Sequence, residues 1–253
     1  VIFKNKIVDI NDYMTLNSAN KFVKLFNNNF SSGVLMLIGG EPLIEWKVIK
    51  YLLRNCRASA ITLFTNATLI TESIAKELRN HNVFVLVSMD GIERHNTARC
   101  YKDGKPMFKD IIVGYKLLKK NKIKVGISSV VTNQNVYDLS KIVRYYHETL
   151  LCDSIGLTTA HHLERCKISL DIDMKEYTKQ MINIFYYCLK KNVYVDQIAK
   201  RVKAIAYGEM KWTACKISGE QVTFYPNARK SQTGCLKLDT ISALRAFNPH
   251  DFQ

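Results

Sequence analysis

Five short apolar segments, each followed by a segment with helical spacing, constrain the fold of this 253-residue chain more than any other feature. The apolar segments cover residues 34–38, 60–65, 83–88, 125–131 and 154–157. Parallel strands need such crossovers, and alternation of strands and helices is typical of α/β domains. A closed barrel has eight strand–helix units, so five units predict an α/β fold of the partial (β/α) barrel type.

Small or polar residues end each predicted strand. They are Gly39-Gly40-Glu41, Thr65-Asn66, Ser88-Met89-Asp90, Thr132-Asn133 and Thr158-Thr159. The carboxyl ends of parallel strands meet at one edge of the sheet, and this is the edge where α/β proteins bind their ligands. We therefore expect a binding site at this edge.

The first apolar segment, residues 34–38, holds five apolar residues in a row, which predicts a strand buried on both faces. Gly39 and Gly40 allow either a turn with positive φ or the close approach of a ligand to the backbone. Pro42 suits the first position of a helix, because the N–H that it lacks would be unpaired there. Glu41 then stands at the carboxyl end of the strand. The alternative is an ordinary strand-to-helix turn with an exposed glutamate.

Composition narrows the range of partners. The net charge of +15 favours acidic partners, but the lysines are spread over predicted helix faces. A nucleic-acid partner is not expected, since no nucleic-acid-binding motif or basic tail is present. No apolar segment reaches the roughly 18 residues of a membrane span, and no signal peptide is visible. Seven cysteines without a C-x-x-C pair predict free thiols in a reducing, cytoplasmic compartment.

Several motifs, in their order along residues 15–160, together resemble the radical S-adenosylmethionine (SAM) enzymes. The resemblance is to the branch with a C-terminal SPASM or twitch domain, which includes anaerobic sulfatase-maturing enzymes and peptide maturases. The matching motifs are Gly39-Gly40-Glu41-Pro42-Leu43, Thr65-Asn66-Ala67-Thr68-Leu69, Ser88-Met89-Asp90-Gly91 with His95 and Arg99, and Val131-Thr132-Asn133-Gln134-Asn135. The resemblance implies a partial (β/α) barrel that binds SAM and an iron–sulfur cluster.

The resemblance also implies roles for individual residues. The segment Gly39-Gly40-Glu41-Pro42 would contact the amino group of the methionine moiety, with Glu41 accepting from the cationic amine. Asn66, Ser88 and Asp90 match positions near the methionine and ribose groups. Arg99 matches a loop arginine that could pair bidentately with the cofactor carboxylate. The alternatives are a turn cap for Ser88 and Asp90 and a surface charge for Arg99.

The sequence departs from the family pattern at both ends. The C-x-x-x-C-x-x-C motif that holds the family's four-iron cluster is absent from these 253 residues. We expect either a chain truncated at its first strand or a degenerate relative, inactive alone in both cases. Residues 1–195 would form the barrel, and residues 196–253 would begin a SPASM- or twitch-like segment. There Cys215 and Cys235 would be ligands of an auxiliary iron–sulfur cluster, or else two unpaired thiols.

Three functional hypotheses follow. The first is a fragment of a radical SAM maturase that modifies a peptide or protein side chain through a 5′-deoxyadenosyl radical. The second is a catalytically degenerate barrel that serves as a peptide-binding or partner subunit. The third is an unrelated α/β enzyme that uses Glu41 and Asp90 for proton transfer. The type of substrate side chain and the oligomeric state do not follow from the sequence.

Overall fold

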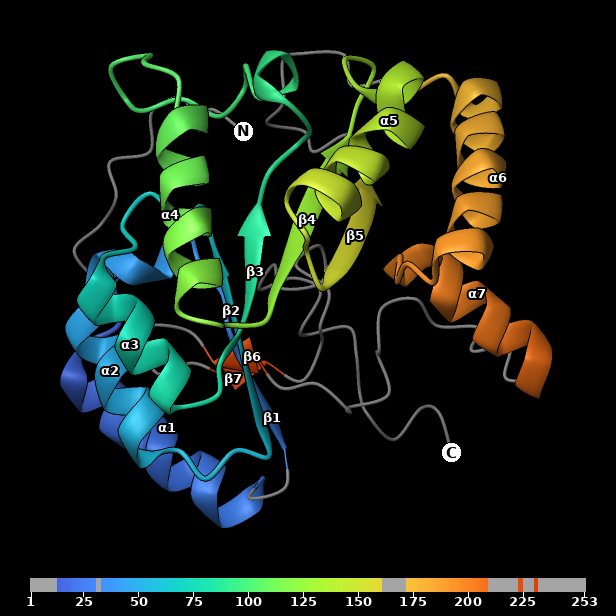
Figure 1. Ribbon diagram of the computed structural model, residues 1–253. Helices are drawn as coiled ribbons and strands as arrows, with labels where there is room; N and C mark the ends of the chain where they lie inside the picture. The colour runs from blue at the N-terminus through green and yellow to red at the C-terminus, as the bar shows by residue number, and fades with distance from the viewer. Residues whose placement is uncertain (1–12, 31–32, 161–171, 209–222, 225–229, 232–253) are drawn as a thin grey trace, which may run out of the picture.

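A computed structural model describes residues 13–30, 33–160, 172–208, 223–224 and 230–231. Its centre is a parallel sheet of five strands in the order β1-β2-β3-β4-β5 (Figure 1). The strands are β1 (Val34–Leu37), β2 (Ala60–Thr65), β3 (Phe84–Ser88), β4 (Val125–Val131) and β5 (Ser154–Thr159). The predicted alternation and the α/β class are confirmed.

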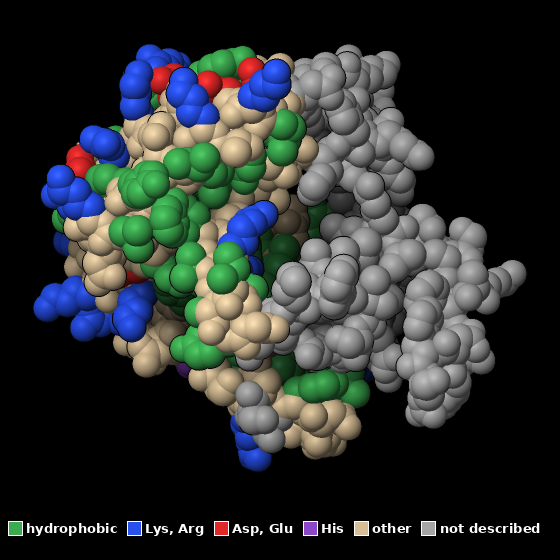
Figure 2. Space-filling view, turned by 90° about the vertical axis from the view of Figure 1, so that its right-hand side faces the viewer, with side chains coloured by type: hydrophobic (Ala, Val, Ile, Leu, Met, Phe, Trp, Pro, Cys, Tyr) green, Lys and Arg blue, Asp and Glu red, His purple; other side chains and the backbone are tan. Residues whose placement is uncertain are grey.

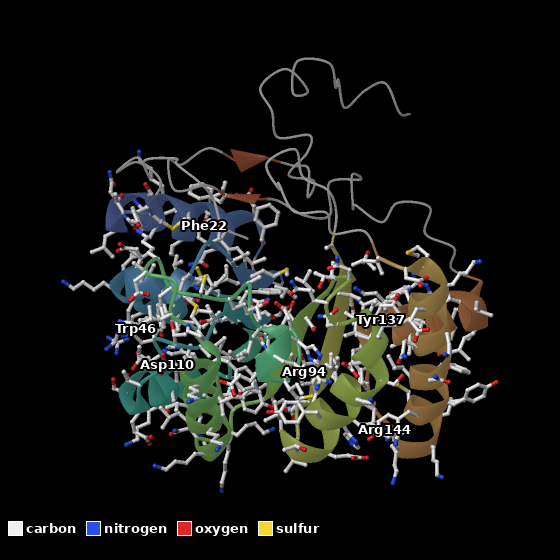
Figure 3. All side chains as sticks on the ribbon, turned by 90° about the horizontal axis from the view of Figure 1, so that it is seen from above. Phe22, Trp46, Arg94, Asp110, Tyr137 and Arg144 are labelled. Atoms are coloured by element: carbon white, nitrogen blue, oxygen red, sulfur yellow. The ribbon has the colours of Figure 1, made fainter. Side chains whose placement is uncertain are left out.

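The helices that precede, connect and follow these strands lie in an arc on one side of the sheet, as Figure 3 shows from above. They are α1 (Leu16–Asn29), α2 (Trp46–Asn55), α3 (Glu72–Asn80), α4 (Phe108–Lys120), α5 (Leu139–Arg144) and α6 (Met174–Lys191), followed by α7 (Asp196–Tyr207). Side chains cap several of them as their sequences suggest. Thr15, Thr71 and Asp173 each accept a hydrogen bond from a backbone N–H in the first turn of the following helix.

The sheet has one face covered by helices and one face turned away from them. On β1, Leu35 and Leu37 are buried against the helices, whereas Val34, Met36 and Ile38 are about half exposed. The prediction that this strand is buried on both faces is therefore wrong, because the helices cover only one face. Buried residues also alternate with partly or fully exposed ones along β2, β3 and most of β5, whereas β4 begins with three buried residues. The apolar core thus lies between the sheet and its helices.

Two predicted helices begin or end differently from the expectation. Pro42 begins a single 3-10 turn, η2 (Pro42–Glu45), and α2 starts only after it. The helix predicted over 136–150 is divided into the 3-10 turn η4 (Val136–Asp138), α5, and a π-helical turn, η5 (Tyr145–Thr149). A third 3-10 turn, η3 (Glu93–His95), lies between β3 and α4. These tighter and wider turns lie beyond what hydrophobic spacing can resolve.

Beyond α6 the structure describes α7 and a small antiparallel pair, β6 (Thr223–Phe224) and β7 (Lys230–Ser231). Val195 forms an isolated parallel bridge with Ile155 of β5, directly before α7. The boundary proposed near residue 195 stays a prediction. Figure 2 looks onto the side of the molecule that carries α6 and α7. It shows hydrophobic side chains gathered on this side, with many of the Lys and Arg side chains around them. None of the described helices combines the length and apolar character needed to cross a bilayer.

Candidate functional site at the carboxyl edge of the sheet

The predicted site residues lie on segments that leave neighbouring strands at the same edge. Glu41 follows β1, Asn66 follows β2, and Ser88 is the last residue of β3. Since all five strands are parallel, these segments emerge on the side to which the arrowheads point in Figure 1. The structure brings the predicted residues together in two contacts, Glu41 with Asn66 and Asp90 with Arg99.

Glu41 joins the ends of β1 and β2. Its Oε1 accepts hydrogen bonds from the Leu43 backbone N–H (3.1 Å) and the Thr65 hydroxyl (2.7 Å). Its Oε2 accepts one from the Asn66 backbone N–H at 2.7 Å. A carboxylate oxygen can accept about two hydrogen bonds, so Oε2 retains one position for a further donor. The alternative of an exposed glutamate at an ordinary turn does not describe this carboxylate.

The two glycines before Glu41 have no internal reason to be glycine. Neither Gly39 nor Gly40 has φ in the left-handed region. Among the residues that the structure describes, a Cβ atom added at Gly40 would meet nothing within 4 Å, and one at Gly39 would meet only Pro42 Cγ at 3.9 Å. Of the two reasons expected for these glycines, positive φ is therefore wrong. The open space above the backbone fits the other reason, close approach of a ligand.

The turn after β2 is fixed by hydrogen bonds of its own. Asn66 Oδ1 accepts from the backbone N–H and the hydroxyl of Thr68, at 2.9 and 2.8 Å. Ala67, which is buried, adopts φ 62°. Its carbonyl oxygen packs so closely on Gly114 of α4 that a Cβ atom at position 114 would overlap it. The Asn66 Nδ2 makes no hydrogen bond to the part of the chain that the structure describes, and so it remains a donor for a ligand.

Asp90 and Arg99 form an ion pair across the loop that follows β3. Arg99 Nη2 donates to Asp90 Oδ1 at 2.8 Å. Arg99 Nε lies 2.7 Å from Oδ2, an ion-pair distance, although its N–H does not point along a hydrogen-bond direction. Asp90 Oδ1 also accepts from the Val130 backbone N–H at 2.8 Å. With its side chain only 22% exposed, Arg99 is not the surface charge of the alternative interpretation.

Two buried asparagines, which sequence reasoning did not single out, hold the same loop. Asn96 is 2% exposed and Asn135 is 1% exposed. Asn96 Oδ1 accepts from the Asp90 N–H, and Asn135 Nδ2 donates to the Asp90 carbonyl oxygen. In the sequence, Asn135 ends the motif that begins at Val131, and Asn96 directly follows His95. The sequence signal for a role of these two residues was their position in loops next to the motifs. Once buried, an amide must find hydrogen-bond partners, and these two find them on the backbone of Asp90.

A second polar cluster lies behind this loop. Asp138 Oδ2 accepts from Arg94 Nη2 at 2.8 Å and lies 3.3 Å from Nε2 of the buried His95. Burial raises the pKa of Asp138, but the hydrogen bonds from Arg94, Lys141 and His95 outweigh it and hold that pKa below its usual value. This cluster ties η3 to η4 and therefore supports the loop that carries Asp90.

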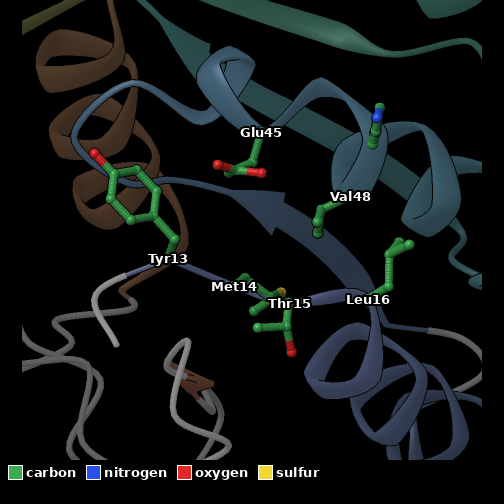
Figure 4. Close-up of a pocket in the computed structure, with 7 residues that line it drawn as sticks. Tyr13, Met14, Thr15, Leu16, Glu45 and Val48 are labelled. Carbon is green, nitrogen blue, oxygen red and sulfur yellow. The ribbon is translucent and has the colours of Figure 1, made fainter. Parts of the chain in front are cut away.

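Two cavities, one beside α1 and α2 and one between α5 and α6, are lined by residues other than the predicted site residues. A cavity of about 410 Å³ lies between the start of α1 and the η2–α2 segment (Figure 4). Its lining residues are Tyr13, Met14, Thr15, Leu16, Glu45, Lys47 and Val48. Within the described residues, no group of three His, Cys, Asp or Glu side chains could hold a metal ion. Cys215 and Cys235 lie outside the described residues.

Comparison with known proteins now identifies the family. The family model described as "Radical SAM superfamily" matches residues 7–146, more than half of the chain. The chain belongs to the radical SAM superfamily. It is 28% identical over 198 residues to an uncharacterized protein of Methanocaldococcus jannaschii, which covers 76% of this chain and 66% of that protein. It is 34% identical over 158 residues to the cysteine-type anaerobic sulfatase-maturating enzyme of Clostridium perfringens strain 13. This alignment covers 58% of this chain and 43% of that enzyme.

Solved structures support the fold of this radical SAM chain. The enzyme anSMEcpe with bound AdoMet aligns with a TM-score of 0.77 at 20% identity, over 95% of this chain and 75% of that one. The same enzyme with bound AdoMet and Kp18Cys peptide aligns with a TM-score of 0.70 at 24% identity. This alignment covers 83% of this chain and 62% of that one. The chain spans about 66% of the length of the Methanocaldococcus jannaschii protein and 43% of the length of the sulfatase-maturating enzyme. The family implies SAM and an iron–sulfur cluster as cofactors.

The described edge offers groups that match the polar groups of SAM. An ammonium group needs acceptors, and Glu41 Oε2 has a free position beside the open glycine backbone. A hydroxyl or a ring nitrogen needs small polar partners, and neither the Ser88 hydroxyl nor Asn66 Nδ2 is hydrogen-bonded within the described segments. A carboxylate needs a cationic donor, which Arg99 provides. The residues present fit the cofactor.

Proposed function

We propose that this chain is part of a radical SAM maturase that modifies a side chain of a peptide or protein in the cytoplasm. The observation that carries the proposal is the open glycine backbone beside a fixed carboxylate, Glu41. It lies at the same edge of the sheet as Ser88 and the loop that carries Asp90 and Arg99. The relatives support the class of substrate. One relative is named a sulfatase-maturating enzyme, and the similar structure of anSMEcpe was solved with bound AdoMet and a peptide.

In this proposal the protein binds and orients a cofactor that performs the difficult chemistry. When bound, and with an iron–sulfur cluster as the electron donor, SAM would supply the radical chemistry that removes a hydrogen atom from the substrate. Gly39 and Gly40 let the backbone approach the methionine moiety, with Pro42 directing the chain away into η2. Glu41 accepts from its amino group, and Asn66 and Ser88 face its polar groups. Arg99 donates to its carboxylate.

The ligands of the radical SAM cluster are not among these 253 residues, because no C-x-x-x-C-x-x-C occurs in them. We propose that they belong to another part of the protein, since the chain spans only part of its relatives. Cys215 and Cys235, in the proposed SPASM- or twitch-like segment 196–253, would be ligands of an auxiliary cluster. Should no such cysteine motif exist in the protein, the second hypothesis applies, a barrel that binds a peptide without radical chemistry.

Calorimetric titration of the protein with SAM under anaerobic conditions tests the proposal. Wild type is expected to bind SAM, and Glu41→Ala is expected to weaken binding. The exposed Glu93→Gln variant, on the same side of the sheet, is the matched control and should bind like wild type. Absence of SAM binding to wild type would exclude the maturase and favour a peptide-binding barrel. Unchanged binding in Glu41→Ala would favour an unrelated α/β protein.

A further inference from the structure

The loop after β3 points to a different role for Asp90 from the one that the family resemblance implies. We infer that Asp90 is a positioning residue, which aims Arg99 at the cofactor carboxylate, and that it does not contact the ribose. Asn96 and Asn135 in turn fix the backbone of Asp90. This inference rests on the proposed function, because it assigns the roles of residues within the same SAM site.

Oδ1 of Asp90 has no capacity left for a hydroxyl partner, and Oδ2 lies against the charged Arg99. Its Oδ1 already accepts from Arg99 Nη2 and from the Val130 backbone N–H, both at 2.8 Å. Its Oδ2 lies 2.7 Å from Arg99 Nε. A ribose hydroxyl could therefore reach Asp90 only at Oδ2, and this oxygen is in ion-pair contact with the guanidinium of Arg99. The side chain of Asp90 is also only 14% exposed.

Arg99 retains donors for a second carboxylate. A guanidinium group is planar and carries five N–H donors along its edges. Asp90 occupies the edge formed by Nε and Nη2. The edge formed by Nη1 and the second N–H of Nη2 has no hydrogen-bond partner among the residues described. An arginine held along one edge loses little further freedom when its other edge binds a carboxylate, so the Asp90 contact prepares Arg99 for binding.

The backbone of Asp90 is held on both sides by asparagine side chains. Its N–H donates to Asn96 Oδ1 at 2.9 Å, and its carbonyl accepts from Asn135 Nδ2 at 3.0 Å. The remaining N–H groups of the two amides donate to the carbonyls of Gly91, Ile92 and Val130. Each amide therefore uses both of its Nδ2 protons and its oxygen. Such fully satisfied buried networks rigidify the segment that they hold.

Two ligands separate the roles of Asp90 in one titration experiment. SAM carries the carboxylate, whereas 5′-methylthioadenosine keeps the adenine and ribose and lacks the amino-acid part. We expect Asp90→Asn and Arg99→Gln each to weaken SAM by at least about tenfold, as loss of charge-assisted hydrogen bonds should. The double variant should be no weaker than Arg99→Gln alone. All three should bind 5′-methylthioadenosine within about twofold of wild type, because hydrogen bonds to uncharged ribose would be untouched.

The asparagines provide an independent variant series. Asn135→Asp removes the donor to the Asp90 carbonyl while keeping the size of the side chain, and it should weaken SAM but not 5′-methylthioadenosine. Asn183→Asp, on the exposed face of α6, is the matched control and should change neither affinity. Thermal unfolding of each variant identifies the temperature at which it is folded, so that loss of structure is not mistaken for loss of binding. A variant with lowered unfolding temperature and wild-type affinity for SAM would contradict the positioning role.

The outcomes distinguish this inference from the proposed function. If wild type binds neither ligand, the proposed function fails and the inference fails with it. If wild type binds both ligands but Asp90→Asn weakens 5′-methylthioadenosine as much as SAM, Asp90 contacts the ribose and only the inference fails. Additive losses of SAM affinity in the double variant would overturn it equally, because two residues that act through one contact cannot lose that contact twice.

Discussion

Glu41 Oε2 lies 2.7 Å from the backbone nitrogen of Asn66, so one carboxylate links the ends of β1 and β2 at the edge where the cofactor is proposed to bind. The same side chain accepts from Thr65 and from Leu43, the second residue of η2. A single glutamate therefore has a structural role and a proposed binding role. This combination predicts that changes at position 41 alter stability as well as affinity.

Glu41→Gln is expected to lower the free energy of unfolding by about 1–3 kcal/mol, the cost of a partly buried donor left without its acceptor. The glutamine amide would place its Nε2 against the N–H of Asn66, so that two donors face each other. Urea unfolding of the variant and wild type measures this difference. Glu72→Gln is the control, because its ion pairs with Lys76 and Lys120 are long and exposed. Equal losses in the two variants would show that Glu41 has no special structural role.

Gly40→Ala is expected to leave stability unchanged and to weaken SAM binding. A Cβ atom at position 40 meets no atom of the described residues within 4 Å. It would, however, extend into the space through which the cofactor approaches the backbone. Thermal unfolding and SAM titration of the same sample measure the two effects. Wild-type affinity in Gly40→Ala would mean that the cofactor does not approach this glycine.

Gly114→Ala is expected to destabilise the fold by about 1–3 kcal/mol, the usual cost of overpacking a close contact. The new methyl group would overlap the carbonyl oxygen of Ala67, and the turn at Ala67 already has φ 62°. Lys116→Ala, two residues further along α4 on its exposed side, is the matched control and should stay within about 0.5 kcal/mol of wild type. Urea unfolding separates the two variants.

Much of the fold follows from the sequence, because burial of one helix face and one sheet face imposes regular spacings. The five strands and the helices between them follow these spacings to within a few residues. The exposure of Val34, Met36 and Ile38 does not, since five apolar residues in a row cannot show which face is covered. The π-helical turn η5 was missed for a similar reason, because one extra residue per turn barely changes the pattern.

The candidate site was predictable in its location and not in its internal contacts. Polar strand ends and parallel topology together place Glu41, Asn66 and Ser88 at one edge. The pairing of Asp90 with Arg99 depends on how the loop between them folds, and no sequence spacing encodes that distance. Asn96 and Asn135 were missed because asparagine is common in exposed loops, and only the structure shows that these two are buried.

The Asp138 cluster predicts a specific dependence of stability on pH. Hydrogen bonds from Arg94, Lys141 and His95, which outweigh burial, lower the pKa of Asp138 in the folded protein. A carboxylate whose pKa is lower in the folded state stabilises the protein above its unfolded pKa of about 4, and this contribution is lost as pH falls through the folded pKa. The free energy of unfolding of wild type should therefore exceed that of Asp138→Asn by a constant amount near neutral pH. The excess should shrink below about pH 4. Urea unfolding of both proteins across this range measures it, and a difference that stays constant down to the acid limit of the fold would show that Asp138 does not act through its charge.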